Sequence, residues 1–110
     1  MSIIVNIYYT GKNGAARKFA EEMISRGIVK EILEESGNEG YEYFLSVKNP
    51  ETLLLIDRWK DRKALDSHHA SPMMEKILAL REKYDLHMRV ERFISEETEI
   101  SNEDEAFIRK

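Results

Sequence analysis

The chain contains no cysteine, so disulfides, thiolate metal sites and cysteine nucleophiles are all excluded. It also lacks any apolar run near the roughly 18 residues that cross a membrane. Lysine and arginine form no basic cluster, and the net charge is −4. A nucleic-acid surface is therefore not expected, since it needs grouped cations that displace counterions. The N-terminal residues have no basic region of the kind that begins a signal peptide, so we expect a cytoplasmic protein.

What the chain does contain is typical of one globular domain. Its 110 residues are 42% hydrophobic and 35% charged, which is enough for a core of its own. The composition changes near the C-terminus, where acidic residues crowd together from Glu96 to Glu105. We therefore expect a folded domain over residues 1–95 and an acidic, solvated extension over residues 96–110.

Four segments have the composition of β-strands, with β-branched and aromatic residues that often alternate with polar ones. They are residues 3–10, 41–47, 52–59 and 86–94. The turn at 48–51 contains Asn49 and Pro50, which predicts an antiparallel hairpin between the second and third strands.

Helical periodicity and capping residues place the helices between these strands. The first helix runs to about Arg26, with Asn13 as a possible cap, and a second stretch follows Gly27 to residue 35. Asp61 is predicted to cap a helix that reaches about residue 69. Ser71 is predicted to cap the next one, with a proline at the first helical position.

The order β-α-β-β-α-β defines an α+β, ferredoxin-like fold with a four-stranded antiparallel sheet. Helices in this topology cover only one face of the sheet, yet residues 53–56 are apolar on both faces. A second copy of the chain would cover the other face, so we expect a homodimer.

The stretch from residue 56 to 72 places the only tryptophan, Trp59, nine positions before His68. His68 follows Leu65 by three residues and so belongs to the inward face of its helix. It is either a core-rim imidazole bonded to backbone or a proton carrier at a pocket mouth. His69 points about 100° away from it, so the two cannot share one metal ion, and we predict no metal site.

Other side chains are open to two interpretations. Asn6 is an amide within an apolar strand, where it must bond either a neighbouring segment or a ligand. Tyr43 is either an ordinary wall residue or part of a site for a flat aromatic ligand. Asp57 and Arg58, next to the tryptophan, are interpreted as an ion pair or a dimer contact.

Three features together resemble the antibiotic biosynthesis monooxygenase family, including its quinol monooxygenases. They are Trp59, the Ala64-Leu65 helix and the run from His68 to Ser71-Pro72, with Tyr43 and Phe44 before the 49–51 turn. The resemblance covers residues 3–95. It implies a dimeric α+β barrel and an enzyme that oxidises a quinol-like or phenolic small molecule with molecular oxygen and no cofactor.

The resemblance also implies roles for individual residues. His68 would be the catalytic base, while Asn6, Trp59 and Tyr43 would bind the substrate. Two positions depart from the family pattern: Met73 stands where many relatives have a second histidine, and Asp57 where many have glutamate. Two alternatives remain open. One is a haem-binding or haem-degrading monooxygenase of the same fold, with His68 on the iron, and the other is an isomerase or a non-enzymatic ligand-binding protein.

Overall fold

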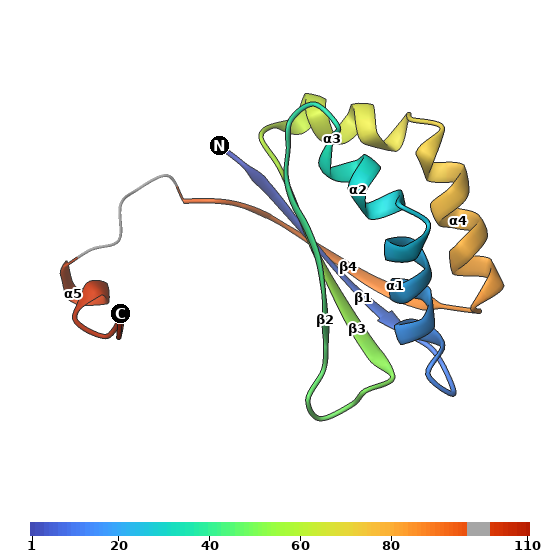
Figure 1. Cartoon of the computed structure of the whole chain (residues 1–110). Helices are drawn as coiled ribbons and strands as arrows, with labels where there is room; N and C mark the ends of the chain where they lie inside the picture. The colour runs from blue at the N-terminus through green and yellow to red at the C-terminus, as the bar shows by residue number, and fades with distance from the viewer. Residues whose placement is uncertain (97–101) are drawn as a thin grey trace.

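A computed structural model describes residues 1–96 and 102–110 (Figure 1). Its elements follow the predicted order, with an extra short helix near the C-terminus. They are β1 (Ile3–Thr10), α1 (Ala15–Ser25), α2 (Ile28–Leu33), β2 (Asn38–Leu45), β3 (Thr52–Trp59), α3 (Arg62–His69), α4 (Met73–Lys83), β4 (His87–Ile94) and α5 (Asn102–Glu105). Within the described ranges, no helix has the length and apolar character needed to cross a lipid bilayer.

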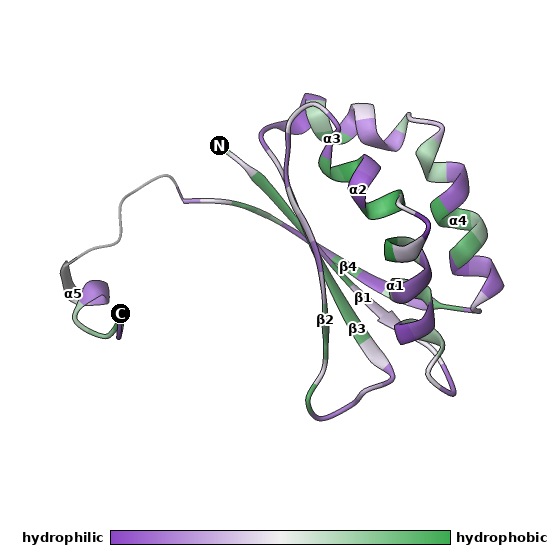
Figure 2. Cartoon of the chain, viewed as in Figure 1, coloured by the Kyte–Doolittle hydropathy of each residue, from purple (hydrophilic) through white to green (hydrophobic). Residues whose placement is uncertain are grey.

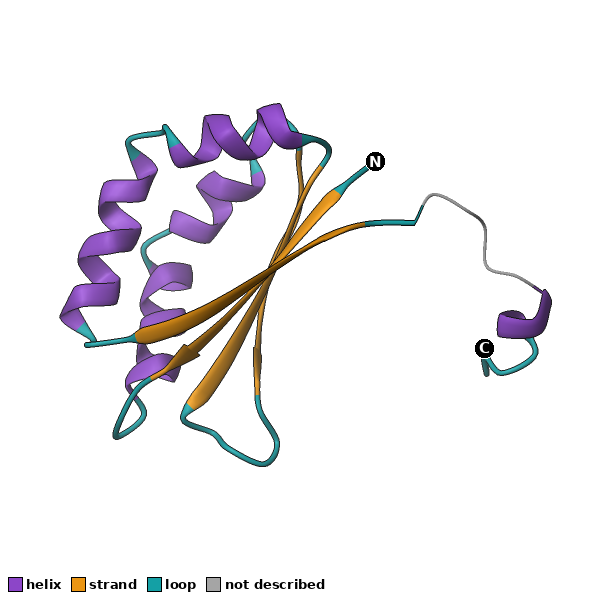
Figure 3. Ribbon diagram, turned by 180° about the vertical axis from the view of Figure 1, so that it is seen from behind, coloured by secondary structure: helices purple, strands orange, loops and turns teal. Residues whose placement is uncertain are grey.

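The four strands form one antiparallel sheet in the order β2-β3-β1-β4. Helices α1 to α4 all lie on one face of this sheet, as the view from behind in Figure 3 shows clearly. This arrangement confirms the ferredoxin-like α+β fold with a four-stranded antiparallel sheet. The two central strands, β1 and β3, carry the residues that matter most for the site.

The core lies between the sheet and the helices, and strand alternation builds it. On β1 and β3 the odd-numbered residues point toward the helices and are buried, from Val5 to Tyr9 and from Leu53 to Trp59. They pack against the inward faces of the helices, which include Phe19, Met23, Ile28, Ile32, Leu65, Ile77 and Leu80. Figure 2 shows the corresponding apolar segments along β1, β3 and the helices.

Local signals near the helix ends were partly right. The prediction for Asp61 is confirmed, since its side chain accepts a hydrogen bond of 2.8 Å from the amide of Ala64. The predictions for Asn13 and Ser71 are wrong. Gly14 precedes α1 and its amide donates to the Glu51 carboxylate instead, while the Ser71 hydroxyl donates back to a carbonyl of α3.

The bounds of the second and last strands are close to those predicted. The second strand begins at Asn38 and ends at Leu45, so Val47 lies beyond it and is fully exposed. The last strand ends at Ile94, after which the amide of Ser95 donates to the carbonyl of Ser2. Residues 97–101 of the predicted acidic extension lie outside the described residues.

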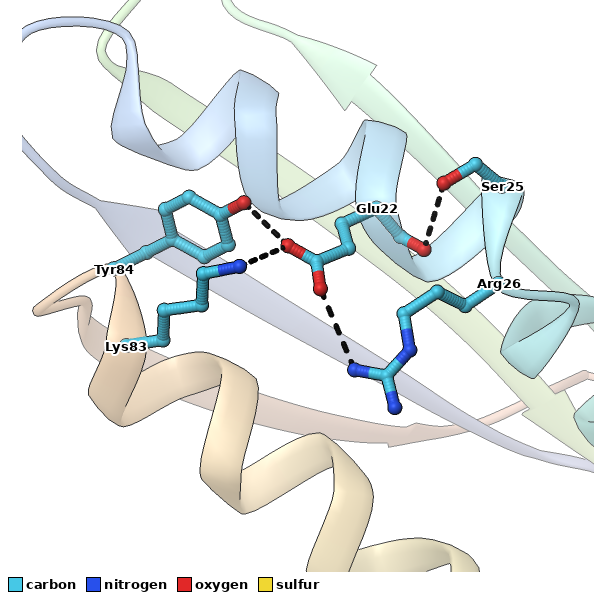
Figure 4. Close-up of polar contacts among 5 residues, drawn as sticks. All are labelled: Glu22, Ser25, Arg26, Lys83 and Tyr84. Carbon is cyan, nitrogen blue, oxygen red and sulfur yellow. Dashed lines mark hydrogen bonds and ion pairs between the residues drawn. The ribbon is translucent and has the colours of Figure 1, made fainter.

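A polar cluster on the surface joins α1 to the end of α4 (Figure 4). The Glu22 carboxylate accepts hydrogen bonds from Lys83 Nζ at 2.8 Å and from the Tyr84 hydroxyl, and its other oxygen lies 3.4 Å from Arg26 Nη1. These donors, Lys83 first and Tyr84 second, lower the pKa of Glu22 to about 2. The cluster thus holds the two long helices together at the end opposite to α3.

Replacing Glu22 by glutamine should lower stability at neutral pH and have a smaller effect in acid. The pKa of Glu22 is lower in the folded chain than its ordinary value of 4.5, so the ionised carboxylate favours folding. The difference between wild type and variant is therefore constant above pH 4.5 and shrinks as the pH falls toward 2. Urea denaturation at several pH values measures it, with the neighbouring Glu21→Gln as control. A difference that stays the same down to the lowest pH would contradict this account.

Candidate functional site

His68 forms the centre of the site through a direct bond to a carboxylate. It lies on the last turn of α3, it is only 4% exposed, and its Nδ1 is 2.8 Å from Oε2 of Glu35. Glu35 follows α2, on the turn that leads into β2. A carboxylate on one ring nitrogen fixes the proton there and leaves the Nε2 lone pair free to accept another proton.

The turn that carries Glu35 lies directly against α3 because of Gly37. This glycine has a φ of 83°, and a Cβ built on it would lie 2.5 Å from the Cβ of Ala64. Its carbonyl also accepts a 2.8 Å hydrogen bond from the amide of Lys60. Glycine is therefore required for both the backbone conformation and the close approach. The approach is what brings Glu35 to His68.

Trp59 lies behind the imidazole and has no exposed surface. Its ring stacks on that of His68, with 4.7 Å between centroids and 30° between planes. The indole Nε1–H donates to Oδ2 of Asp57 at 3.1 Å. Trp59 therefore packs against His68 from the core side. It also connects His68 with a second carboxyl group, that of Asp57.

Asp57 is a buried carboxyl group on the helix-facing side of β3. It is 4% exposed, and within the described part of the chain its Oδ1 has no hydrogen-bond partner. Burial raises its pKa to about 6, against the opposing effects of the Trp59 indole and of His68. The predicted ion pair with Arg58 is wrong, because neighbouring strand residues point to opposite faces. Arg58 pairs with Glu39 instead.

His68 lines two hollows that differ greatly in size. We call the larger one, of about 410 Å³, the outer hollow; it is lined by Glu35, Ser36, Lys60, Asp61, Lys63, Ala64, Ser67 and His68. The smaller one, of about 30 Å³, is the inner cavity between helices and sheet. Its polar lining consists of Tyr41, Asp57, His68, His69 and Arg81, and the rest of its wall is apolar. The imidazole thus lies between a large hollow and a small one.

The structure brings together two of the four predicted site residues. Trp59 and His68 are in contact, as their spacing suggested. The prediction that Asn6 shares their cavity is wrong: Asn6 pairs with Ile56 on β3 and points, like it, away from the helices. The amide Oδ1 is buried there, with no hydrogen-bond partner among the described residues.

Tyr43 lies on the same face of the sheet as Trp59 but is not among the residues that line either hollow. Its hydroxyl donates to that of Tyr41 at 3.4 Å, and its ring packs edge-on against Phe19. Burial raises the pKa of the Tyr43 hydroxyl well above its usual value. The side chain is a wall residue of the core in this structure.

Sequence reasoning missed Glu35 and did not assign Asp57 to the site. No local pattern links Glu35 to His68, since 33 positions separate them. For Asp57 a signal exists: it is a carboxylate that follows an apolar stretch of the strand and lies on the same side as Leu55 and Trp59. No group of three His, Asp or Glu side chains in the described ranges could hold a metal ion.

Comparison with known proteins identifies the family. A sequence model of the antibiotic biosynthesis monooxygenase family matches residues 2–80, and the chain belongs to this family. No curated protein matches the chain by sequence.

Solved structures share the fold. A conserved protein from Methanosarcina mazei Go1 is 24% identical, with a TM-score of 0.74 over 87% of this chain and 94% of that one. The protein PA3566 from Pseudomonas aeruginosa is 18% identical, with a TM-score of 0.71 over 86% and 93%. SnoaB, a cofactor-independent oxygenase from Streptomyces nogalater, is 14% identical, with a TM-score of 0.72 over 88% and 95%. At these identities the likeness is one of fold.

Proposed function

We propose that the protein is a cofactor-independent monooxygenase that oxidises a quinol-like or phenolic small molecule with molecular oxygen. The observation that carries the proposal is the Glu35–His68 pair at the wall of the outer hollow. A base oriented by a carboxylate is what removal of a phenolic proton requires. The outer hollow falls within the usual size range of small-molecule sites, about 300–1,000 Å³.

In this proposal His68 is the catalytic base. Its Nε2 takes the proton of a substrate hydroxyl, and the Glu35 carboxylate stabilises the imidazolium that results. The phenolate so formed is richer in electrons than the phenol and reduces oxygen directly. For a dihydroxynaphthalene, one oxygen atom bonds to the ring and the other leaves as water, so that a hydroxynaphthoquinone is formed. All four electrons come from the substrate.

The other residues have supporting roles. Trp59 acts on His68 rather than on the substrate, because it is wholly buried and stacks on the imidazole. Lys60, Lys63 and Ser67 surround the substrate in the outer hollow. The inner cavity is too small for an aromatic ring.

An oxygen electrode tests the function. Protein freed of metal and flavin is given a dihydroxynaphthalene in the presence of ¹⁸O₂, and each product molecule is expected to contain one labelled oxygen atom. Oxygen uptake no faster than the oxidation of the dihydroxynaphthalene in buffer alone would rule the proposal out. Titration with hemin is the companion measurement, because a Soret band that disappears in His68→Ala would favour the haem-binding alternative.

We also propose that two copies of the chain pack through the open face of the sheet. Apolar side chains on that face point away from the helices and are only partly covered: Ile4, Tyr8, Phe44, Leu54, Ile56 and Phe93. Figure 3 shows that none of the drawn helices lies over it. Covering this surface would remove apolar area from water, which favours association.

Light scattering on a sizing column tests the dimer. Twice the chain mass of 12.9 kDa gives an expected mass of about 26 kDa. Leu54→Arg places a charge in the middle of the open face and is expected to shift the protein toward the monomer. A single species of the chain mass at micromolar concentration in the wild type would overturn the dimer.

A further inference from the structure

The inner cavity is lined by a carboxyl group, one oxygen of which has no hydrogen-bond partner among the described residues. Asp57 uses Oδ2 to accept from the Trp59 indole, while its Oδ1 is buried and bonds none of the described residues. Leaving a buried carboxyl oxygen without a hydrogen bond is costly. The adjoining space of about 30 Å³ is large enough to hold a water molecule.

The cavity offers further polar partners to such a water. Tyr41 and Arg81 line it together with Asp57. Arg81 donates from Nε to the Tyr9 hydroxyl, which leaves other guanidinium N–H groups available. A buried water normally makes about three hydrogen bonds, and these three side chains can supply them.

We propose that the inner cavity is a hydration site whose water molecule bonds Asp57 Oδ1 and Arg81. Asp57 is then a positioning residue, and the His68 ring lies between two carboxyl groups. Glu35 contacts the imidazole directly, and Asp57 acts on it through Trp59, whose ring stacks on the imidazole. The inference rests on the proposed function only for the role of His68 as base.

The electrostatic interaction between Asp57 and His68 supports this arrangement. Burial raises the pKa of Asp57 to about 6, and the positive charge on His68 opposes this. The ionisation of Asp57 therefore depends on the charge of the neighbouring His68. Asp57 interacts electrostatically with Tyr9, Tyr41, Tyr43, His68 and Arg81. His69 also lines the cavity, and Arg92 lies on the same face of the sheet, where both it and Asp57 pair with Val5.

Trp59 provides a direct probe, because it is the only tryptophan and its N–H donates to Asp57. In ¹H–¹⁵N NMR spectra without any substrate, the indole signal is expected to shift with a midpoint near pH 6. Asp57→Asn should lack this step. His68→Gln should move it to higher pH by about half a pH unit or more, since the cation that favours the carboxylate is gone. A nuclear Overhauser effect between the indole N–H and water is expected at all pH values.

The exposed Asp85→Asn serves as control and should titrate like the wild type. The dispersed indole signal itself reports that each variant is folded. Two results would overturn the proposal: an Asp57→Asn curve equal to that of the wild type, or no contact with water at the indole. Because no substrate is present, either failure is independent of whether the protein proves to be an oxygenase.

Discussion

His68→Gln is expected to slow oxygen uptake with a dihydroxynaphthalene by about a hundredfold or more, the usual contribution of a positioned general base. Glutamine fills similar space but cannot take up a proton. The loss should fall on kcat with little change in KM, since the substrate ring binds in the outer hollow without needing the proton transfer. Steady-state rates from an oxygen electrode, corrected for oxidation in buffer, measure the effect.

Two further variants are needed to interpret the rate of His68→Gln. His87→Gln removes a histidine that is highly exposed on β4 and should leave the rate unchanged. Glu35→Gln keeps a hydrogen-bonding group near His68 but removes its charge, and about a tenfold loss is expected. If His68→Gln and the wild type consume oxygen at the same rate, His68 is not the base.

Gly37→Ala is expected to lower the free energy of unfolding by about 3 kcal/mol. Two costs add up: alanine disfavours the φ of 83°, and its Cβ would come within 2.5 Å of the Ala64 Cβ. The turn would have to move off α3 and carry Glu35 away from His68. Urea denaturation measures the first effect, and the oxygen-uptake rate reports the second.

The chain offers a matched control for the backbone part. Gly14 has a similar φ of 77°, but no atom lies within 4 Å of the place where its Cβ would be. Gly14→Ala should therefore cost only about 1 kcal/mol. Adding Ala64→Gly to Gly37→Ala should recover part of the difference by removing the clash. If the two substitutions lower the free energy of unfolding equally, the contact between residue 37 and Ala64 does not limit the size of the side chain at position 37.

Much of the fold could be predicted because its signals are local. The apolar stretch within residues 52–59 and the turn before it predict the hairpin, and β3 has those bounds. Asp61 followed by a helical pattern is an equally local signal, and the structure confirms the helix cap that it predicts. The strand order followed from the sequence of elements, since the ferredoxin-like arrangement leaves little choice once the order is known.

The site was predictable only where a single element determines it. Trp59 and His68 meet because a short cap and one helix connect them. Asn6 was misplaced because β1 is apolar on both faces, with Ile4 and Tyr8 on one and Val5 and Ile7 on the other. Such a strand does not reveal which face lies under the helices. Glu35 reaches the site only through a tertiary contact, which no pattern along the chain records.

The raised pKa of Asp57 has a consequence for the thermodynamics of the whole domain. Its carboxyl group has a pKa of about 6 when folded, above the ordinary value of 3.8, so the native state binds this proton more tightly than the unfolded chain does. Its contribution to stability is therefore greatest in acid and falls as the pH rises from 3.8 through 6, by up to about 3 kcal/mol. At neutral pH the ionised Asp57 carboxylate in the interior therefore lowers the free energy of unfolding. Laboratory selection for heat resistance alone would be expected to replace this aspartate.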